Sequence, residues 1–247
     1  MKPAELHNCW LLHARPYRDT SLILDLFTQT QGRISAVARG ARAQGRGRSA
    51  SKRSLLQPFV PLQVSLAGRG ELRTLGVVEA LAAGMPLVGE RLLSALYVNE
   101  LLVRLLPLHE NEMQIFSSYG ALLQALAGEA ELEPLLRNFE LQLLDVLGYG
   151  LQLTHDAASG ESIRSGVWYQ LQQEGGFIRQ PPDVSDTRTL YEGEALIALA
   201  QRDFSGMDAR RTAKRLLRTV LQQHLGGREL ASRALFGKSL AAPTSTP

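Results

Sequence analysis

The sequence predicts an α+β protein in which a small β barrel precedes a mostly α-helical C-terminal domain. Two observations carry this prediction. Apolar residues alternate as in half-buried strands through the first part of the chain, and near Pro86 the period changes to that of helices. The 247 residues, 45% of them hydrophobic, are enough for one large domain or two modest ones with cores of their own.

Five β-like runs divide the N-terminal part of the chain. They are, in order, residues around 10–12, 21–28 (SLILDLFT), 33–39 (RISAVAR), 59–66 and 72–81. The last two are joined by AGRG, a typical hairpin turn. Five strands with one long loop between the third and the fourth favour a five-stranded barrel of the oligonucleotide-binding (OB) type, one of several small β folds that fit.

Helical periodicity dominates the remainder. Helices are expected at 90–106, 113–126, 133–147, 189–201 and 209–225, the last with Asp208 as its N-cap. Between about 150 and 180 the helical period fails, and 167–171 and 176–178 resemble short strands. We therefore expect an OB-fold DNA-binding domain at 1–82, a mainly helical domain at 83–239 with a short zinc-free β insertion near 150–180, and a flexible tail at 240–247.

Basic residues are concentrated in one segment. From Leu26 to Gly70 there is no Asp or Glu, whereas basic residues occur at Arg33, Arg39, Arg42, Arg46, Arg48, Lys52, Arg53 and Arg69. Most lie in RGARAQGRGRSASKR at 39–53, which has almost nothing apolar to bury and is predicted to be a mobile loop. Such cations suit a polyanionic partner, because each neutralised phosphate releases counterions. A solvated linker is the alternative.

The strand at 33–39 places Arg33 and Arg39 on one face and Ile34 on the other. Because the segment from Leu26 to Gly70 contains only two aromatic residues, Phe27 and Phe59, we expect binding dominated by the DNA backbone, with little base discrimination. A second concentration of charge lies on the expected helix at 209–225, at Arg210, Arg211, Lys214, Arg215 and Arg218. That helix could serve nucleic acid, an acidic peptide or solubility.

Several chemistries find no pattern in the sequence. The five histidines are scattered, the single Cys9 fits a buried structural thiol, and no metal-ligand spacing occurs. There is no GxxxxGK[ST] and no GxSxG, so we expect neither a catalytic centre nor a cofactor. No apolar stretch approaches a membrane span and no signal sequence is evident, so we expect a cytoplasmic, nucleoid-associated protein.

In several stretches the chain closely resembles the RecO family of bacterial recombination mediators. They are, in chain order, LHARPYRDTSLILDLFTQTQGRISAVARGAR (12–42), LQPFVPL (56–62), GRGELRTL (68–75), LYVNELLVRLL (96–106), EPLLRNFELQLLDVLGYG (133–150), GGFI (175–178) and HLGGRELASRALF (224–236). The resemblance implies an OB barrel on a helical domain, with DNA repair and homologous recombination as the function. Members of the family bind single- and double-stranded DNA, anneal strands coated with single-strand-binding protein, and load RecA with RecR.

The resemblance also suggests site residues. Arg33, Arg39 and Arg42 match basic DNA-contacting positions of the family, whereas Arg46, Arg48, Lys52 and Arg53 rest on charge alone. Arg137 matches the residue expected to pair with the acidic tail of single-strand-binding protein. Phe139 and Leu143 are candidate walls for that pocket or ordinary helix core. Many members carry a four-cysteine zinc module where this chain has no cysteine, so no metal is expected.

Two alternatives to a DNA-binding mediator stay open at this point. The first is a non-enzymatic adaptor whose basic surfaces bind acidic protein partners instead of DNA, and a salt titration would separate the two. The second is a hydrolase that acts on nucleic acid through catalytic groups dispersed in the sequence.

Overall fold

A computed structural model describes residues 5–42, 48–181 and 189–239. The chain forms two compact units, one made of residues 1–129 and 229–247 and the other of residues 130–228. Each unit is described separately below.

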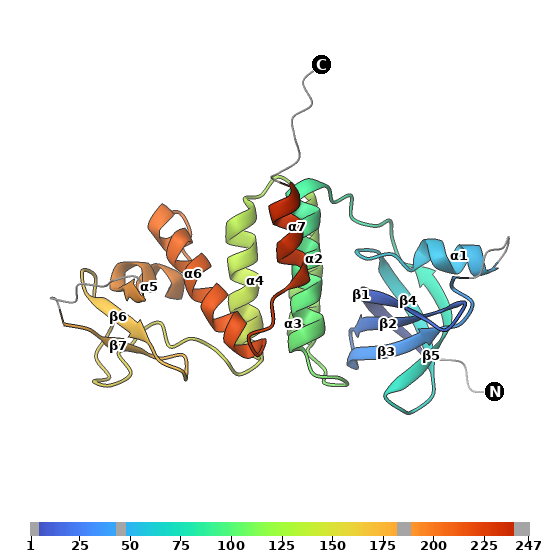
Figure 1. The fold of residues 1–247 in the computed structure, drawn as a ribbon, viewed down its shortest axis with the longest axis horizontal. Coiled ribbons are helices and arrows are strands. Elements are labelled where there is room, and N and C mark those ends of the chain that lie inside the picture. The colour runs from blue at the N-terminus through green and yellow to red at the C-terminus, as the bar shows by residue number, and fades with distance from the viewer. Residues whose placement is uncertain (1–4, 43–47, 182–188, 240–247) are drawn as a thin grey trace, which may run out of the picture. The chain divides into compact units, whose positions relative to one another are not determined.

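The first unit contains a closed five-stranded barrel (Figure 1). Its strands are β1 (Leu6–Tyr17), β2 (Ser21–Thr28), β3 (Gly32–Ala38), β4 (Pro61–Ala67) and β5 (Leu72–Ala80). The barrel order is β1-β2-β3-β5-β4; β3 and β5 are parallel and the other pairs are antiparallel. The prediction of an N-terminal OB-type barrel followed by a helical region is confirmed.

The barrel interior follows from the period-two alternation of its strands. Inward-facing side chains of every strand form one apolar core, to which Leu11, Leu24, Ala36, Leu62 and Leu75 belong. Cys9 lies in the same core at 2% exposure, and burial raises the pKa of its thiol to about 12. The predicted role of a buried structural thiol is confirmed for this cysteine.

One part of the basic segment is helical and not a loop. Helix α1 covers Arg48–Leu55, and Leu56 directly after it is buried in the barrel core. Ala, Arg, Lys and Leu have high helix propensity, and Lys52 and Arg53 in the last turn interact favourably with the helix dipole. The charge of these residues concealed that pattern, so the predicted mobile loop is wrong for this stretch.

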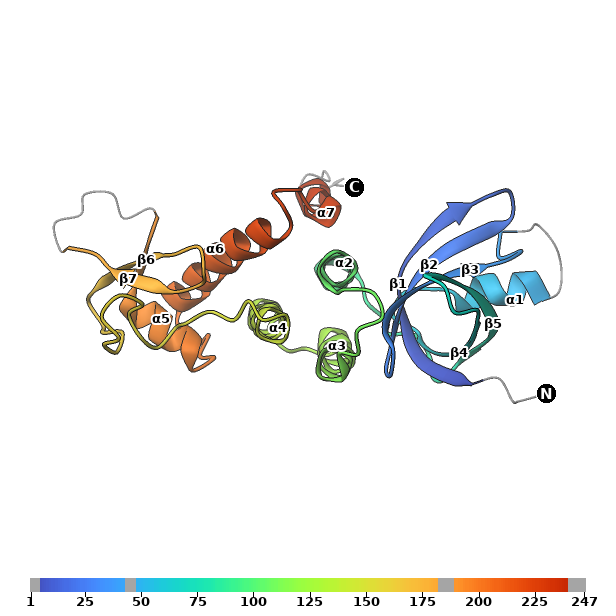
Figure 2. The ribbon, with the colours of Figure 1, turned by 90° about the horizontal axis from the view of Figure 1, so that it is seen from below.

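Three helices complete the first unit: α2 (Gly89–Leu105), α3 (Met113–Ala127) and α7 (Ala231–Ser239). Figure 2 shows α2 and α3 beside the β1 wall of the barrel. Trp10 of β1 packs edge-on against Tyr119 at 5.7 Å, and the Tyr119 hydroxyl donates to Asn99 Oδ1 at 2.5 Å. The Asn99 amide in turn donates to the Leu12 carbonyl at 2.9 Å. These buried contacts join the barrel to α2 and α3.

The second unit combines helices α4 (Leu132–Val146), α5 (Gly193–Ala200) and α6 (Met207–His224) with a small sheet. The sheet has the order β7-β6-β8, from β6 (Trp168–Leu171), β7 (Phe177–Arg179) and β8 (Leu190–Glu192). The predicted strands near 167–171 and 176–178 are confirmed.

Two predicted details of the helical region are wrong. The helix expected from residue 189 begins at Gly193, because Leu190–Glu192 pairs with β6 as β8. Gly206, not Asp208, is the N-cap of α6, and Asp208 lies in the first turn near Arg211. Helix α7 was not predicted. The tail at 240–247 lies outside the described residues.

Candidate nucleic-acid interface

The outer face of the barrel is set by the register of β1, β2 and β3. Arg15 pairs with Ile23, which pairs with Val37, so these three residues lie side by side across three strands. Alternation along β3 puts Ile34 inside and Arg33 outside, and Arg39, directly after the strand, is exposed, as the sequence predicts. The two outward arginines, however, have different surroundings.

Arg33 is engaged within the protein. Its side chain is 15% exposed, its Nη1 lies 3.3 Å from Asp25 Oδ1, and its Nε donates to the Leu106 carbonyl at 2.9 Å. His13 lies 3.7 Å from the other oxygen of the same carboxylate. Arg33 therefore neutralises a buried aspartate and ties β3 to the end of α2, which leaves little of its charge for a ligand.

Arg39 and Arg42 follow β3 and are both exposed. The backbone N–H of Arg42 donates to the Thr20 carbonyl at 2.8 Å, which holds this residue against the β1–β2 turn. Within the described parts of the chain, neither side chain forms an ion pair. Their charges are available to an anionic ligand.

The remaining predicted cations of this segment lie on or near α1. Arg46 is outside the described residues, and Arg48 opens the helix. Lys52 and Arg53 occupy its last turn, where Lys52 is partly buried and Arg53 exposed. The structure thus places Arg53 on the surface and describes only the backbone of Arg48.

The sequence prediction missed two further cations at the same end of the barrel. Arg15 in β1 and Arg18 in the following turn are exposed, and the Arg18 guanidinium lies over the Tyr17 ring, 5.2 Å from its centroid. Because Arg42 is hydrogen-bonded to Thr20, Arg18 and Arg42 belong to neighbouring turns. The RPYR motif at 15–18 is the sequence signal for these two cations, and it was missed because it lies outside the basic segment.

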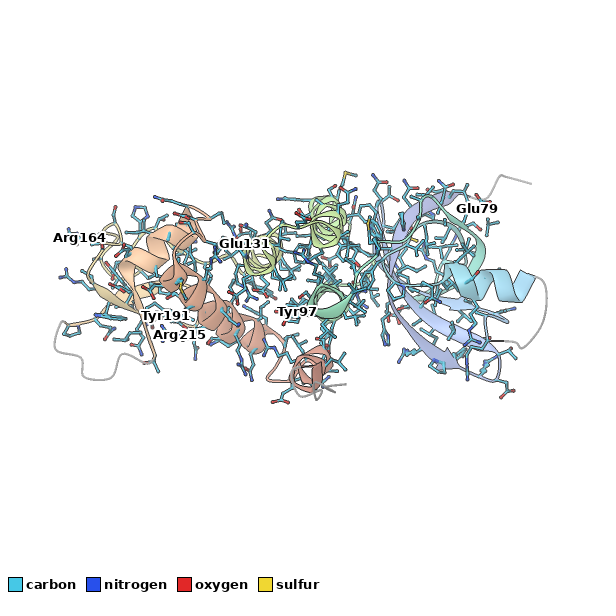
Figure 3. All side chains as sticks on the ribbon, turned by 90° about the horizontal axis from the view of Figure 1, so that it is seen from above. Glu79, Tyr97, Glu131, Arg164, Tyr191 and Arg215 are labelled. Carbon is cyan, nitrogen blue, oxygen red and sulfur yellow. The ribbon has the colours of Figure 1, made fainter. Side chains whose placement is uncertain are left out.

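Helix α6 uses most of its charge within the second unit. Arg210 pairs with Glu131 at 2.6 Å, Lys214 with Glu133 at 3.0 Å, and Arg211 loosely with Asp208 at 3.8 Å. Arg215 lies over the Tyr191 ring at 4.4 Å and donates to the Leu190 carbonyl, and Figure 3 labels this pair. Arg218 is exposed and has no ion pair in the described part of the chain.

The three residues expected to hold a peptide tail lie on α4. The Phe139 and Leu143 side chains are 2% and 0% exposed, so they form helix core and do not line a surface pocket. Arg137 is 11% exposed and its Nη1 lies 2.7 Å from Glu140 Oε2, on a carboxylate with no exposed surface. Its Nε is buried and makes no hydrogen bond within the protein.

A hollow of about 340 Å³ lies elsewhere in the second unit, between the end of α4, the β6–β7 turn and the end of α6. Tyr149 and His224 line it and stack on each other at 3.8 Å, and burial lowers the pKa of His224. None of the residues predicted to bind DNA or a peptide lines this hollow.

The loop before β6 is held in place by hydrogen bonds to the carboxylate of Asp156. This loop lies in the region for which the sequence predicts no zinc module. Asp156 Oδ1 accepts from the N–H groups of Ala158 and Ser159 at 2.9 and 2.7 Å, and Oδ2 accepts from the Arg179 N–H at 2.6 Å.

Over the described ranges, no three His, Cys, Asp or Glu residues are grouped to hold a metal ion. Over the same ranges, no helix has the length and apolar character of a membrane span.

Comparison with known proteins finds a matching family model for the N-terminal part of the chain and another for the C-terminal part. The family model described as Recombination protein O N terminal matches residues 3–83, and the one described as Recombination protein O C terminal matches residues 87–234. The chain belongs to the RecO family of DNA repair proteins. Members named DNA repair protein RecO include those of Psychromonas ingrahamii, at 45% identity over 94% of this chain and 97% of the relative, and of Methylococcus capsulatus, at 45% over 95% and 93%. The Yersinia enterocolitica member is 44% identical over 96% of each chain.

The extent of the first RecO family match agrees with the extent of the barrel. The family match ends at residue 83, directly after β5, so it covers the whole barrel and the exposed cations at one of its ends. The second match spans the helices from α2 to α6 and ends within α7.

Proposed function

We propose that this protein is a recombination mediator without covalent chemistry, which binds single- and double-stranded DNA and promotes annealing of complementary strands. The observation that carries this proposal is the pair of exposed arginines, Arg39 and Arg42, which form no ion pair in the described structure and lie at one end of an OB-type barrel. No ion pair in the described structure neutralises these two charges, so they can bind phosphates without breaking an existing ion pair.

Annealing needs no catalytic group. Two complementary strands repel each other through their phosphates, and a protein that presents cations to both lowers that repulsion. Phosphate contacts carry no sequence information, which suits a protein that must act on any gap. Arg33 contributes here by neutralising Asp25, a carboxylate that would otherwise repel DNA from the same barrel face.

The test replaces both exposed arginines. Arg39→Glu/Arg42→Glu should weaken binding to a labelled single-stranded oligonucleotide by at least tenfold, because two attractive phosphate contacts become repulsive. Arg164→Glu is the matched control, since Arg164 is 62% exposed in the second unit. Fluorescence anisotropy at a fixed salt concentration measures both variants. Unchanged affinity in the double variant, with its fold intact by circular dichroism, would remove the proposal.

A salt titration of the parent protein, followed by the same anisotropy measurement, separates DNA from an acidic protein partner. DNA binding through several phosphates should fall by orders of magnitude between low and physiological salt. Labelled DNA incubated with Mg²⁺ should stay intact, because the proposed function includes no hydrolysis. A DNA-cleaving activity that copurifies with the protein through several columns would contradict this.

We further propose that the protein binds the C-terminal tail of single-strand-binding protein and acts with RecR to load RecA at gaps. Family membership supports this proposal. Arg137 remains the candidate for the tail carboxylates, because its buried Nε has no hydrogen-bond partner within the protein. Phe139 and Leu143 would then support α4 from the core without touching the tail.

The burial of Glu140 decides how Arg137 must be tested. Arg137→Ala alone removes a counter-ion from a fully buried carboxylate, which typically costs about 3–5 kcal/mol of stability. The double variant Arg137→Met/Glu140→Gln removes both charges together and should keep the fold. We expect it to bind a tail peptide several-fold more weakly than the parent protein does, with naked DNA bound equally. Glu140→Gln alone is the control, and equal losses for peptide and DNA would argue against a tail site at Arg137.

A further inference from the structure

We propose that the end of the β1–β2 hairpin is a contact site for unpaired DNA, in which the Tyr17 ring and the Arg18 guanidinium stack on bases while Arg15, Arg39 and Arg42 hold the backbone. The inference rests on the proposed DNA binding. It adds an aromatic platform, which the sequence prediction did not find, and a preference for single strands over duplex.

The first support is strand register. Tyr17 pairs with Ser21 and Arg15 with Ile23, so Arg15 and Tyr17 alternate onto the same outer face of the barrel. The neighbouring strand adds Val37, which pairs with Ile23. Arg39 directly follows Ala38, the last residue of β3, and its side chain is exposed at this end of the barrel. An aromatic ring and two half-buried aliphatic side chains therefore lie between exposed arginines.

The second support is an open edge. Strand β1 pairs with β4 only from Leu6 to Trp10, whereas its pairing with β2 continues to Tyr17. The last residues of β1 thus have a strand on one side only within the described structure. Arg15 and Pro16 lie on this edge, and a charge together with a proline that lacks an N–H discourages addition of another protein strand. A nucleic-acid strand needs no such pairing and can lie against the edge.

The third support is the geometry of Tyr17 itself. The ring is partly exposed, and the guanidinium carbon of Arg18 lies 5.2 Å from its centroid. Arg18 adopts a left-handed backbone conformation with φ of 49°, which is uncommon for a residue with a side chain. Tyrosine rings and arginine guanidinium planes both stack on nucleobases. The two side chains therefore already present flat surfaces of the kind that an unpaired base can occupy.

The fourth support is the charge around the ring. Arg15, Arg18, Arg39 and Arg42 are all exposed and form no ion pair within the described residues, and the Arg42 N–H bonds to Thr20 of the hairpin turn. Asp19 in the same turn is exposed as well, so the cluster remains net positive. Bases in a duplex are already stacked on one another, so a duplex can use the charges of Arg15, Arg39 and Arg42 but not the flat faces of Tyr17 and Arg18. This difference is the source of the expected strand preference.

The experiment compares oligo-dT with a duplex hairpin of equal phosphate number by fluorescence anisotropy, at one salt concentration. Tyr17→Leu should weaken oligo-dT binding about tenfold, because stacking of one base contributes that order of affinity, and should change duplex binding less than twofold. Tyr17→Phe should bind as the parent does. Tyr149→Leu is the matched control, since Tyr149 is an exposed tyrosine of the second unit, 46% exposed.

The outcomes separate this inference from the proposed function. A parent protein that binds neither DNA overturns both. A parent that binds DNA, with Tyr17→Leu unchanged or equally impaired on both ligands, overturns the stacking site alone. If Tyr17→Leu unfolds at a lower temperature than the parent, Arg18→Ala at the exposed turn replaces it. That variant should also lose more affinity for oligo-dT than for duplex, and equal losses would again overturn the inference.

Discussion

Two arginines, one within β3 and one directly after it, show how the surroundings of a residue decide its role. Arg33 lies in β3 and Arg39 directly follows the last residue of that strand; they have the same chemistry, and the sequence assigns both to DNA. The structure separates them, because Asp25 and the Leu106 carbonyl lie beside Arg33 and no ion-pair partner lies beside Arg39 in the described residues. Asp25 lies on the neighbouring strand β2, where strand register decides whether it meets Arg33, and the Leu106 carbonyl comes from beyond the end of α2, so both contacts depend on the fold.

The first prediction follows at this scale. Arg33→Ala should lower the free energy of unfolding by about 2–3 kcal/mol, because it leaves a buried carboxylate without its counter-ion and a carbonyl without its donor. Arg39→Ala should change stability by less than about 0.5 kcal/mol, as for most exposed positions. Urea unfolding followed by circular dichroism measures both. Equal stabilities of the two variants would show that the Arg33 contacts do not contribute to the fold.

At the scale of elements, the sequence predicts what depends on local periodicity. Strands β2 and β5 and helices α2 to α4 agree with their predicted positions to within about two residues, because their apolar spacing is regular. Helix α1 and strand β8 depend on tertiary contacts instead. In the sequence, the arginines and serines of α1 resemble a linker. In the structure, Leu56 directly after the helix is buried in the barrel core. The residues of β8 are too few to show a period, and only pairing with β6 defines them.

The second prediction concerns the loop that Asp156 holds against β7. Burial alone would raise the pKa of Asp156, but hydrogen bonds from Ser159, Arg179 and Ala158 outweigh it and hold the pKa below its ordinary value of 3.8. Because the folded pKa is the lower one, this stabilisation is fully present above pH 3.8 and is lost as the pH falls through the folded pKa.

Asp156→Asn should therefore destabilise the protein at neutral pH by about 1–3 kcal/mol, since a neutral amide accepts these backbone hydrogen bonds more weakly. Its stability should also depend less on pH below 4 than that of the parent. Urea unfolding at pH 7 and at several values down to pH 3 measures both effects. Asp19→Asn is the control, because Asp19 is an exposed aspartate that forms no ion pair within the described residues.

At the scale of the whole molecule, counting charge by sequence region is a poor guide to where a polyanion binds. The N-terminal 80 residues carry a net charge of +7, residues 81–206 carry −10, and residues 207–247 carry +6. The two basic regions look equivalent in sequence. In the structure, acidic residues of the middle region neutralise part of α6, as Glu131 does for Arg210 and Glu133 for Lys214. The exposed arginines near the β1–β2 hairpin have no such partner among the described residues.

The third prediction turns this difference into a measurement of salt dependence. Each phosphate contact that a cation makes adds about one to the slope of log Kobs against log salt concentration, so Arg42→Ala should reduce that slope by about one. Lys214→Ala should leave it unchanged, because Lys214 is already paired with Glu133 at 3.0 Å in the free protein. Arg218→Ala examines an exposed α6 cation that forms no ion pair in the described structure. If Lys214→Ala lowers the slope as much as Arg42→Ala does, DNA competes successfully with the α6 ion pairs, and the binding surface includes that helix as well as the barrel.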